Sequence, residues 1–179
     1  NKMTGYELLG RTVGIIGFGS IGRQVARICS GIGMKTLVCD ACEIPESALR
    51  EYGTERRTME ELLRQSDFVT VHVPLTPETA NLIAAPQFDR MKPTAVLINA
   101  ARGGIVNKKD LLKALKSGRI YAAAADVFTS EPPAADAWVQ ELLYLDNFIL
   151  TSHLAARTPE AEINTVNLST DVMIDLLSR

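Results

Sequence analysis

The sequence predicts an α/β fold built on a doubly wound parallel sheet. Two observations predict it. Short apolar runs alternate with stretches of helical periodicity along the 179 residues, and the first run leads through three closely spaced glycines into a helix. A helix between two such strands returns the chain to the end of the sheet where the first strand began, so the strands are parallel. These crossover connections are right-handed. Because a chain of this length can bury one sizeable core, we expect a single domain over residues 1–179.

The first predicted strand covers residues 12–16 and runs into a glycine-rich turn. Gly17, Gly19 and Gly22 have the spacing G-x-G-x-x-G. In a strand–turn–helix context, the first glycine allows a tight turn, the second lets the backbone approach a pyrophosphate, and the third lets the helix pack close to the strand. The helix that follows is expected to end at residues 31–33 and to bury one apolar face, made of Ile21, Val25, Ile28 and Ile32.

A second predicted strand, residues 35–39, ends at Asp40, about twenty-three residues beyond Gly17. A carboxylate at this point can accept hydrogen bonds from the ribose hydroxyls of a dinucleotide. Its charge repels a 2′-phosphate, and neither Ala41 nor Cys42 supplies a cation to hold one, which favours NAD over NADP. The alternative is a glycine turn that only joins a strand to a helix. The strand, the helix and the spaced carboxylate together favour a Rossmann-type dinucleotide site.

The rest of the chain continues the alternation of strands and helices. Pro45 lies in the first turn of one short helix, Thr58 and Glu61 form a capping box at the start of another, and Asn107 caps a third. A loop is expected over residues 131–137. The further expected strands cover residues 68–73, 95–99, 120–125 and 148–151, and the expected helices cover 45–52, 58–63, a short segment from Pro86, 107–118, and a long segment from Thr158 with Ile163, Val166, Thr170, Met173 and Leu177 along one side.

The composition narrows the function classes. A net charge of −2 gives no electrostatic reason to expect nucleic acid, and no apolar run approaches the roughly 20 residues of a membrane helix. No signal-peptide pattern is visible, and three cysteines do not make a disulfide framework, so we expect a cytoplasmic protein. Cys39 and Cys42 have C-x-x-C spacing, but a strand end beside a carboxylate disfavours the thiolate that a redox motif needs. No residue cluster has metal-ligand spacing, so no metal is expected.

Charged side chains follow several of the predicted strands, at the edge where ligands bind in such sheets. The guanidinium of Arg102 suits a carboxylate substrate, although a surface ion pair is the alternative. His153 suits proton transfer at neutral pH, although a structural role is the alternative. Glu131 would orient an imidazole beside it, or else is a solvated loop residue. We interpret the other histidine, His72, as strand-end structure near the adenosine.

Five motifs in this order resemble the D-isomer-specific 2-hydroxyacid dehydrogenases, a family that includes phosphoglycerate dehydrogenase and hydroxypyruvate/glyoxylate reductases. They are GRTVGIIGFG at 10–19, VHVPLTPET at 71–79, INAARGGIV at 98–106, ADVF at 125–128 with Glu131-Pro132, and HLAA at 153–156. The resemblance implies that Arg102, Glu131 and His153 are catalytic. The cofactor site expected from the fingerprint and the resemblance consists of Gly17, Gly19, Ser20, Ile21, Gly22, Asp40, His72, Val73, Pro74, Thr79, Ala100, Ala101, Arg102, Asp126, His153, Ala155 and Ala156.

The activity implied by the resemblance is hydride transfer between NADH and a 2-keto acid or D-2-hydroxy acid. His153 would exchange a proton with the carbonyl oxygen, Glu131 would keep the imidazole protonated and oriented, and Arg102 would bind the substrate carboxylate. Asp126 would help to place the nicotinamide. The chain departs from the family at Ser20, where an Arg is frequent, and at Ser152, where a Pro is usual. Neither change removes a group that the reaction needs.

In this family the nucleotide domain is inserted between two halves of a substrate domain. We therefore expect residues 1–179 to be the NAD-binding domain, with residues 1–10 and about 158–179 as its connections, unable to turn over substrate when isolated and forming a homodimer. One alternative is a non-enzymatic, corepressor-like NAD-sensing module. Another is formate or phosphite oxidation on the same scaffold, although formate dehydrogenases of this family carry Gln where Glu131 stands. The motifs do not identify the 2-hydroxy acid.

Overall fold

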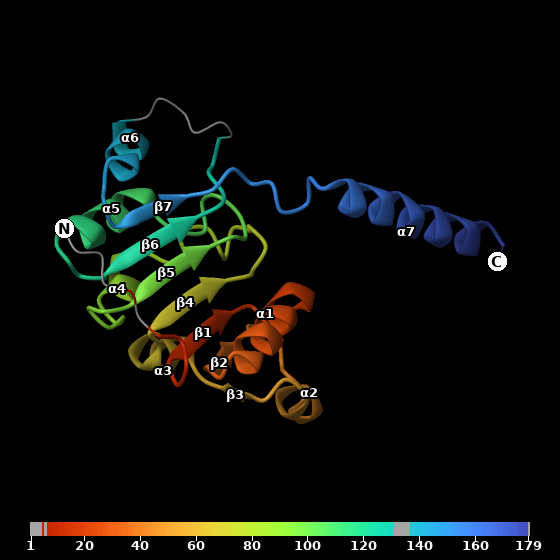
Figure 1. Cartoon of the computed structure of the whole chain (residues 1–179), viewed down its shortest axis with the longest axis horizontal. Helices are drawn as coiled ribbons and strands as arrows, with labels where there is room; N and C mark the ends of the chain where they lie inside the picture. Colours follow the sequence, from red (N-terminus) through yellow and green to blue (C-terminus); the bar gives the residue numbers. More distant parts are fainter. Residues whose placement is uncertain (1–4, 6, 131–136, 179) are drawn as a thin grey trace.

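The computed structural model describes residues 5, 7–130 and 137–178. A seven-stranded, entirely parallel sheet in the order β3-β2-β1-β4-β5-β6-β7 forms its centre (Figure 1). The predicted doubly wound α/β fold is thus confirmed, and it is Rossmann-like. The strands are β1 Thr12–Ile16, β2 Lys35–Cys39, β3 Thr54–Arg56, β4 Phe68–Val71, β5 Val96–Asn99, β6 Ala122–Ala125 and β7 Phe148–Leu150.

Helices cover both faces of the sheet, and a separate apolar core lies under each layer. The helices are α1 Ser20–Gly31, α2 Glu46–Glu51, α3 Met59–Gln65, α4 Ala85–Phe88, α5 Lys108–Lys116, α6 Ala137–Leu143 and α7 Pro159–Leu177. Helices α1 and α2 bury Ala26 and Leu49 against one face. Helices α3, α4 and α5 bury residues such as Leu62, Phe88 and Leu111 against the other. Because both faces are covered, the central strands are apolar almost throughout, as parallel strands usually are.

Side-chain caps begin the helices where the sequence predicts them. The Thr58 hydroxyl accepts a hydrogen bond from the Glu61 N–H at 3.3 Å, and the Glu61 carboxylate accepts one from the Thr58 N–H at 2.9 Å. The side-chain oxygen of Asn107 accepts from the Asp110 N–H at 3.1 Å. These bonds satisfy backbone donors that have no partner within the first turn of a helix, which is why the predicted starts of α3 and α5 are correct.

The predicted apolar face of α1 is wrong for its isoleucines and correct for Val25, which packs against the core. Ile21 and Ile28 are 67% and 64% exposed, whereas Gly22 and Ala26 are the buried residues of this helix. The reason is the closeness of the helix to the sheet: a Cβ added to Gly22 would lie 2.1 Å from the backbone oxygen of Gly17. Only small side chains fit at that distance, so Ile21 and Ile28 point away from the sheet, whereas the half-buried Val25 packs against the core.

Two elements were not predicted, and several boundaries differ. Strand β3 has only three residues, and its Glu55 and Arg56 are exposed, so it lacks an apolar pattern. Helix α6 begins at Ala137, the last residue of the expected loop, and residues 131–136 lie outside the described part of the chain. Strand β4 ends at Val71 rather than at residue 73, β5 begins at Val96, β6 at Ala122, and β7 ends at Leu150.

Helix α7 begins where predicted, at Pro159, and the Thr158 hydroxyl accepts a hydrogen bond from the Ala161 N–H at 3.1 Å. It extends away from the sheet (Figure 1), and none of its residues is buried. Its predicted apolar side therefore contributes nothing to the two cores described above. No helix in the described ranges is both long and apolar enough to span a bilayer.

Candidate functional site: a cleft at the carboxyl edge of the sheet

The glycine-rich turn between β1 and α1 has three glycines in three different environments. Gly17 has a φ of +95°, and a Cβ there would lie 2.5 Å from the backbone oxygen of His72, so both conformation and space require glycine. Gly22 is buried against Gly17. Around Gly19, by contrast, an added Cβ would meet no described atom within 4 Å. The turn is closely packed on its inner side and open at Gly19, beside the exposed N-terminus of α1.

Asp40 ties the end of β2 to this turn. Its carboxylate accepts hydrogen bonds from the Phe18 N–H at 2.6 Å and from the Cys42 N–H at 2.8 Å. Asp40, the predicted hydrogen-bond partner of the ribose, therefore also holds the glycine turn in place. An ionised carboxylate has about four lone-pair sites, so two remain for further donors.

A cleft of about 720 Å³ opens beside Asp40 at the carboxyl ends of β1 to β4. This volume is in the range of cofactor sites. Four of the predicted cofactor residues line it: Gly17, Asp40, Val73 and Thr79. It is lined in addition by Ile16, Cys39, Ala41, Arg56, Arg57, Thr58, Met59, Glu61, Glu78 and Leu82.

Among the cleft residues that the sequence interpretation missed, Arg56 and Arg57 carry the positive charges. They lie at and just beyond the end of β3, and β3 itself was not predicted. Ala41 and Cys42, which adjoin Asp40 in the chain, supply no cation. The parallel pairing of β2 with β3 nevertheless brings two arginines to the same edge of the sheet, so the expectation that Asp40 has no cation nearby is wrong.

The segment after β4 closes another side of the cleft. The His72 N–H donates to the Ile16 carbonyl at 2.7 Å, and its ring nitrogen lies 2.9 Å from the Thr70 hydroxyl. Burial lowers the pKa of His72, which favours a neutral ring and agrees with its interpretation as strand-end structure. The Thr79 hydroxyl donates to the Pro74 carbonyl at 2.6 Å, so it both closes this turn and lines the cleft.

Arg102 follows β5, and its backbone is held by a residue that the sequence interpretation did not single out. The buried Asn99 side chain donates to the Arg102 carbonyl at 3.1 Å and accepts from the Ala101 N–H at 3.2 Å. The Arg102 side chain itself is exposed, with one guanidinium nitrogen donating to the Ala101 carbonyl at 2.7 Å. The residue is therefore fixed at its backbone and open to solvent at its charged end.

Asp126, at the end of β6, holds the backbone that carries His153. One carboxylate oxygen accepts from the Thr151 hydroxyl and, at 2.9 Å, from the His153 N–H. His153 has a φ of +53°, a conformation uncommon for residues other than glycine. Ser152 stands just before it, at one of the positions where the chain departs from the usual family motif. Glu131, the third predicted catalytic residue, lies outside the described residues.

The predicted site residues therefore fall into two groups along one sheet edge. The first lies at the ends of β1, β2 and β4 and includes the glycine turn, Asp40 and Thr79. The second lies at the ends of β5, β6 and β7 and consists of Ala100, Ala101, Arg102, Asp126, His153, Ala155 and Ala156. Because β4 and β5 are adjacent in the sheet, the two groups are neighbours, and an extended ligand can reach from one to the other.

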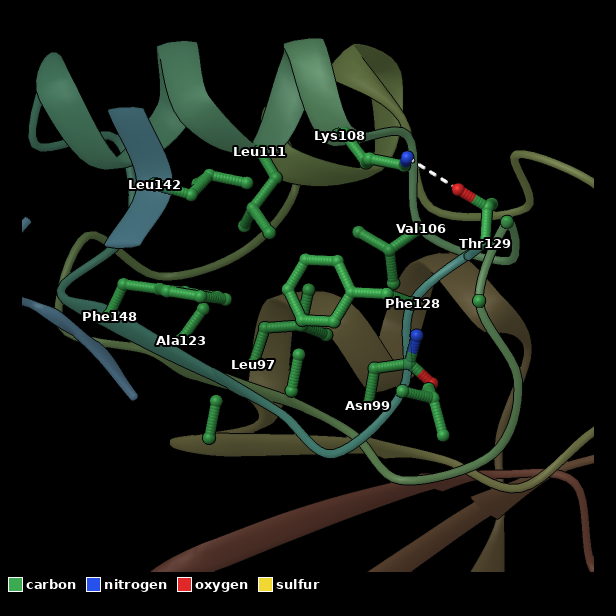
Figure 2. Close-up of a pocket in the computed structure, with 15 residues that line it drawn as sticks. Leu97, Asn99, Val106, Lys108, Leu111, Ala123, Phe128, Thr129, Leu142 and Phe148 are labelled. Atoms are coloured by element: carbon green, nitrogen blue, oxygen red, sulfur yellow. Dashed lines mark hydrogen bonds between the residues drawn. The ribbon is translucent and has the colours of Figure 1, made fainter. Parts of the chain in front are cut away.

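A second, internal cavity is too small to be a ligand site. It lies between β5, β6 and α5, and residues such as Leu97, Leu111, Ala123 and Phe128 line it (Figure 2). Its volume is about 30 Å³, room for roughly one water molecule. At its rim, the Lys108 ammonium donates to the Thr129 hydroxyl at 2.5 Å. No group of three or more His, Cys, Asp or Glu residues in the described segments could hold a metal ion.

Comparison with known protein families identifies the relatives of this protein. Residues 1–155 match the family described as D-isomer specific 2-hydroxyacid dehydrogenase, NAD binding domain. The chain belongs to this family. NAD is accordingly the cofactor of the domain, in agreement with the expectation from the glycine turn and Asp40.

Individual 2-hydroxyacid dehydrogenases resemble the chain over most of its length. It is 44% identical to a D-3-phosphoglycerate dehydrogenase of Archaeoglobus fulgidus over 163 residues, which cover 91% of this chain and 30% of that protein. It is 46% identical to a glyoxylate reductase of Pyrococcus furiosus over 157 residues, which cover 88% of this chain and 45% of the relative. The chain thus spans half or less of the length of these two proteins.

The fold also matches solved structures of the family. One of them is the NAD-complexed form of a D-isomer specific 2-hydroxyacid dehydrogenase from Lactobacillus delbrueckii ssp. bulgaricus. It superposes with a TM-score of 0.89 at 30% identity, over 98% of this chain and 55% of that one.

Proposed function

We propose that the protein is an NAD-dependent oxidoreductase that interconverts a 2-keto acid and a D-2-hydroxy acid. One observation carries the proposal: the cleft of about 720 Å³ beside Asp40 and the exposed Arg102 and His153 lie along the same edge of one parallel sheet. The activities for which the relatives are named, glyoxylate reductase and D-3-phosphoglycerate dehydrogenase, support a small 2-keto acid as the substrate class.

The geometry of the glycine turn suits NAD. We infer that the pyrophosphate lies at Gly19 and at the N–H groups of Ser20 and Ile21, because space is open there and the dipole of the 12-residue helix α1 favours an anion. The Asp40 carboxylate would accept from the ribose hydroxyls with the lone pairs that its backbone bonds leave free. Ala100, Ala101 and Asp126 would lie toward the nicotinamide, which supplies or accepts a hydride when NAD is bound.

The catalytic roles follow from the charged side chains at the ends of β5, β6 and β7. The exposed guanidinium of Arg102 would bind the substrate carboxylate through two parallel N–H bonds and so orient the carbonyl. His153 would donate a proton to the carbonyl oxygen during reduction and remove it during oxidation. Glu131 would stabilise the imidazolium. We further infer that Asp126 is a positioning residue for His153, because it binds the His153 N–H.

The test of this proposal is turnover by the full-length protein. We expect NADH-dependent reduction of at least one of glyoxylate, hydroxypyruvate, pyruvate and 3-phosphohydroxypyruvate. His153→Ala should lower the rate by ~10²–10⁴-fold, as expected for loss of a general acid. NADH binding without turnover of any keto acid would instead support the non-enzymatic, NAD-sensing alternative.

Residues 1–179 alone should bind NADH yet reduce no keto acid near the ~10 s⁻¹ of typical enzymes, because we infer that the substrate domain completes the active site. A homodimer and a cytoplasmic location are part of the same proposal. Light scattering of the full-length protein tests the dimer, and a monomeric mass would refute it.

A further inference from the structure

The cleft beside Asp40 contains two arginines that an NAD site does not require. Strand β3 pairs in parallel with β2, with Arg56 opposite Val38, and the Arg57 N–H donates to the Val38 carbonyl at 2.9 Å. Asp40 follows Val38 by two residues, directly after the end of β2. The pairing therefore brings Arg56, Arg57 and the ribose carboxylate to one end of the sheet, where all three line the same cleft.

The two arginines differ in their partners. The Arg57 guanidinium forms an ion pair with Glu55 and donates to the Arg56 carbonyl at 2.8 Å, so it is held along β3. The Arg56 side chain is exposed and has no hydrogen-bond or ion-pair partner among the described residues. A guanidinium in this state keeps its full set of donors for a ligand.

We propose that Arg56 and Arg57 form a subsite for the 2′-phosphate of NADP(H), so that this cleft binds both nicotinamide dinucleotides and Arg56 controls the affinity for the phosphorylated one. The fork of a guanidinium matches phosphate oxygens, and the pair supplies two positive charges. The inference rests on the proposed function, in that the adenosine ribose must lie at Asp40.

The acidic residues of the cleft determine which dinucleotide binds more tightly. Asp40 is fixed by its bonds to Phe18 and Cys42 and cannot easily turn away from a phosphate. Glu61 is engaged at the start of α3, and Glu78 also lines the cleft. Three carboxylates against two guanidinium groups leave the site slightly negative. NADH should therefore bind at least tenfold more tightly than NADPH, while NADPH binding remains measurable.

The test compares the affinities for NADH and NADPH before and after one substitution. Arg56→Gln should weaken NADPH binding by at least fivefold and change NADH binding by less than twofold, measured by fluorescence titration of the protein. Arg50→Gln is the matched control, since Arg50 is also exposed but lies on α2 and does not line the cleft. It should change neither affinity by more than twofold. The NADPH affinity of the unsubstituted protein should also fall more steeply with salt than its NADH affinity.

Three results would overturn the inference: no NADPH binding by the unsubstituted protein, no change in NADPH affinity in Arg56→Gln, or equal losses for both dinucleotides. Each of these results differs from the result that would refute the proposed function. That result is an unsubstituted protein that does not bind NADH. Retained NADH affinity in Arg56→Gln also shows that the variant is folded.

Discussion

Gly19→Ala should weaken NADH binding while leaving the fold nearly unchanged. Gly19 is the N-cap of α1 with φ −71° and ψ −165°, a backbone conformation that alanine adopts without strain. An added Cβ meets no described atom within 4 Å, so the substitution fills only the space that we assign to the pyrophosphate. It therefore separates the binding role of this glycine from any structural one.

The magnitude follows from the cost of inserting a methyl group into a close contact, about 1–3 kcal/mol. At about 1.4 kcal/mol per factor of ten, NADH affinity should fall roughly 5- to 150-fold. Alanine is also a poorer N-cap than glycine, by about 1 kcal/mol at most for a position with no side-chain cap to lose. The melting temperature should therefore fall by no more than about 4 °C.

Gly22→Ala is the matched comparison, because its Cβ would lie 2.1 Å from the Gly17 carbonyl oxygen rather than in open space. Alanine gains about 1 kcal/mol of helix propensity, but displacing the turn costs about 1–3 kcal/mol or more. We expect a net loss of up to about 2 kcal/mol and a melting temperature lower by up to roughly 8 °C. NADH titration and thermal unfolding of both variants provide the assay. Unchanged NADH affinity in Gly19→Ala would refute the assignment of this turn.

Three further predictions concern groups outside the glycine turn. Burial opposes ionisation of Asp67, but bonds from the Lys92 ammonium (2.8 Å) and the Thr12 N–H (2.9 Å) outweigh it and lower its pKa. Asp67→Asn should therefore cost about 1–2 kcal/mol at pH 7 in denaturant unfolding. The difference should shrink as the pH falls below the ~3.9 of an ordinary Asp and through the lowered pKa of the folded protein; a pH-independent difference would contradict this. Asp126→Ala, but not Asp126→Asn, should accelerate hydrogen exchange at residues 151–156 roughly tenfold, because the alanine cannot accept from the His153 N–H; equal exchange would exclude the positioning role. Burial, and secondarily the charge of Asp40, raises the pKa of Cys39 to about 12. Iodoacetamide at pH 8 should therefore modify the exposed Cys42 first. Equally fast modification of Cys39 would be inconsistent with its burial.

The predictable parts of the fold are those encoded by neighbours in the chain. The glycine turn, the Thr58 capping box and the ends of strands at Asp40 and Asp126 depend on local backbone chemistry, and the structure confirms their positions. The buried face of α1 depends instead on how closely the helix approaches the sheet. Periodicity alone predicts Ile21 and Ile28 in the core, but both are exposed, and the fully buried residues of the helix are Gly22 and Ala26.

The parts of the site that were missed come from pairings distant in the sequence. Strand β3 is an edge strand held by backbone bonds to β2, and its exposed polar residues carry no signal that would place Arg56 beside Asp40. Asn99 was missed for a related reason. Its buried side chain forms hydrogen bonds to the backbone of Ala101 and Arg102, and this role can be recognised only once the turn after β5 is known.

The position of the bound dinucleotide tests the central claim most directly. A crystal structure of the protein with NAD should place the pyrophosphate at Gly19 and the N–H groups of Ser20 and Ile21. One adenosine ribose hydroxyl should lie within hydrogen-bond distance of the Asp40 carboxylate, about 2.5–3.0 Å between oxygens. Well-ordered NAD bound elsewhere on the domain, or with its ribose turned away from Asp40, would contradict the assignment of the cleft as the cofactor site.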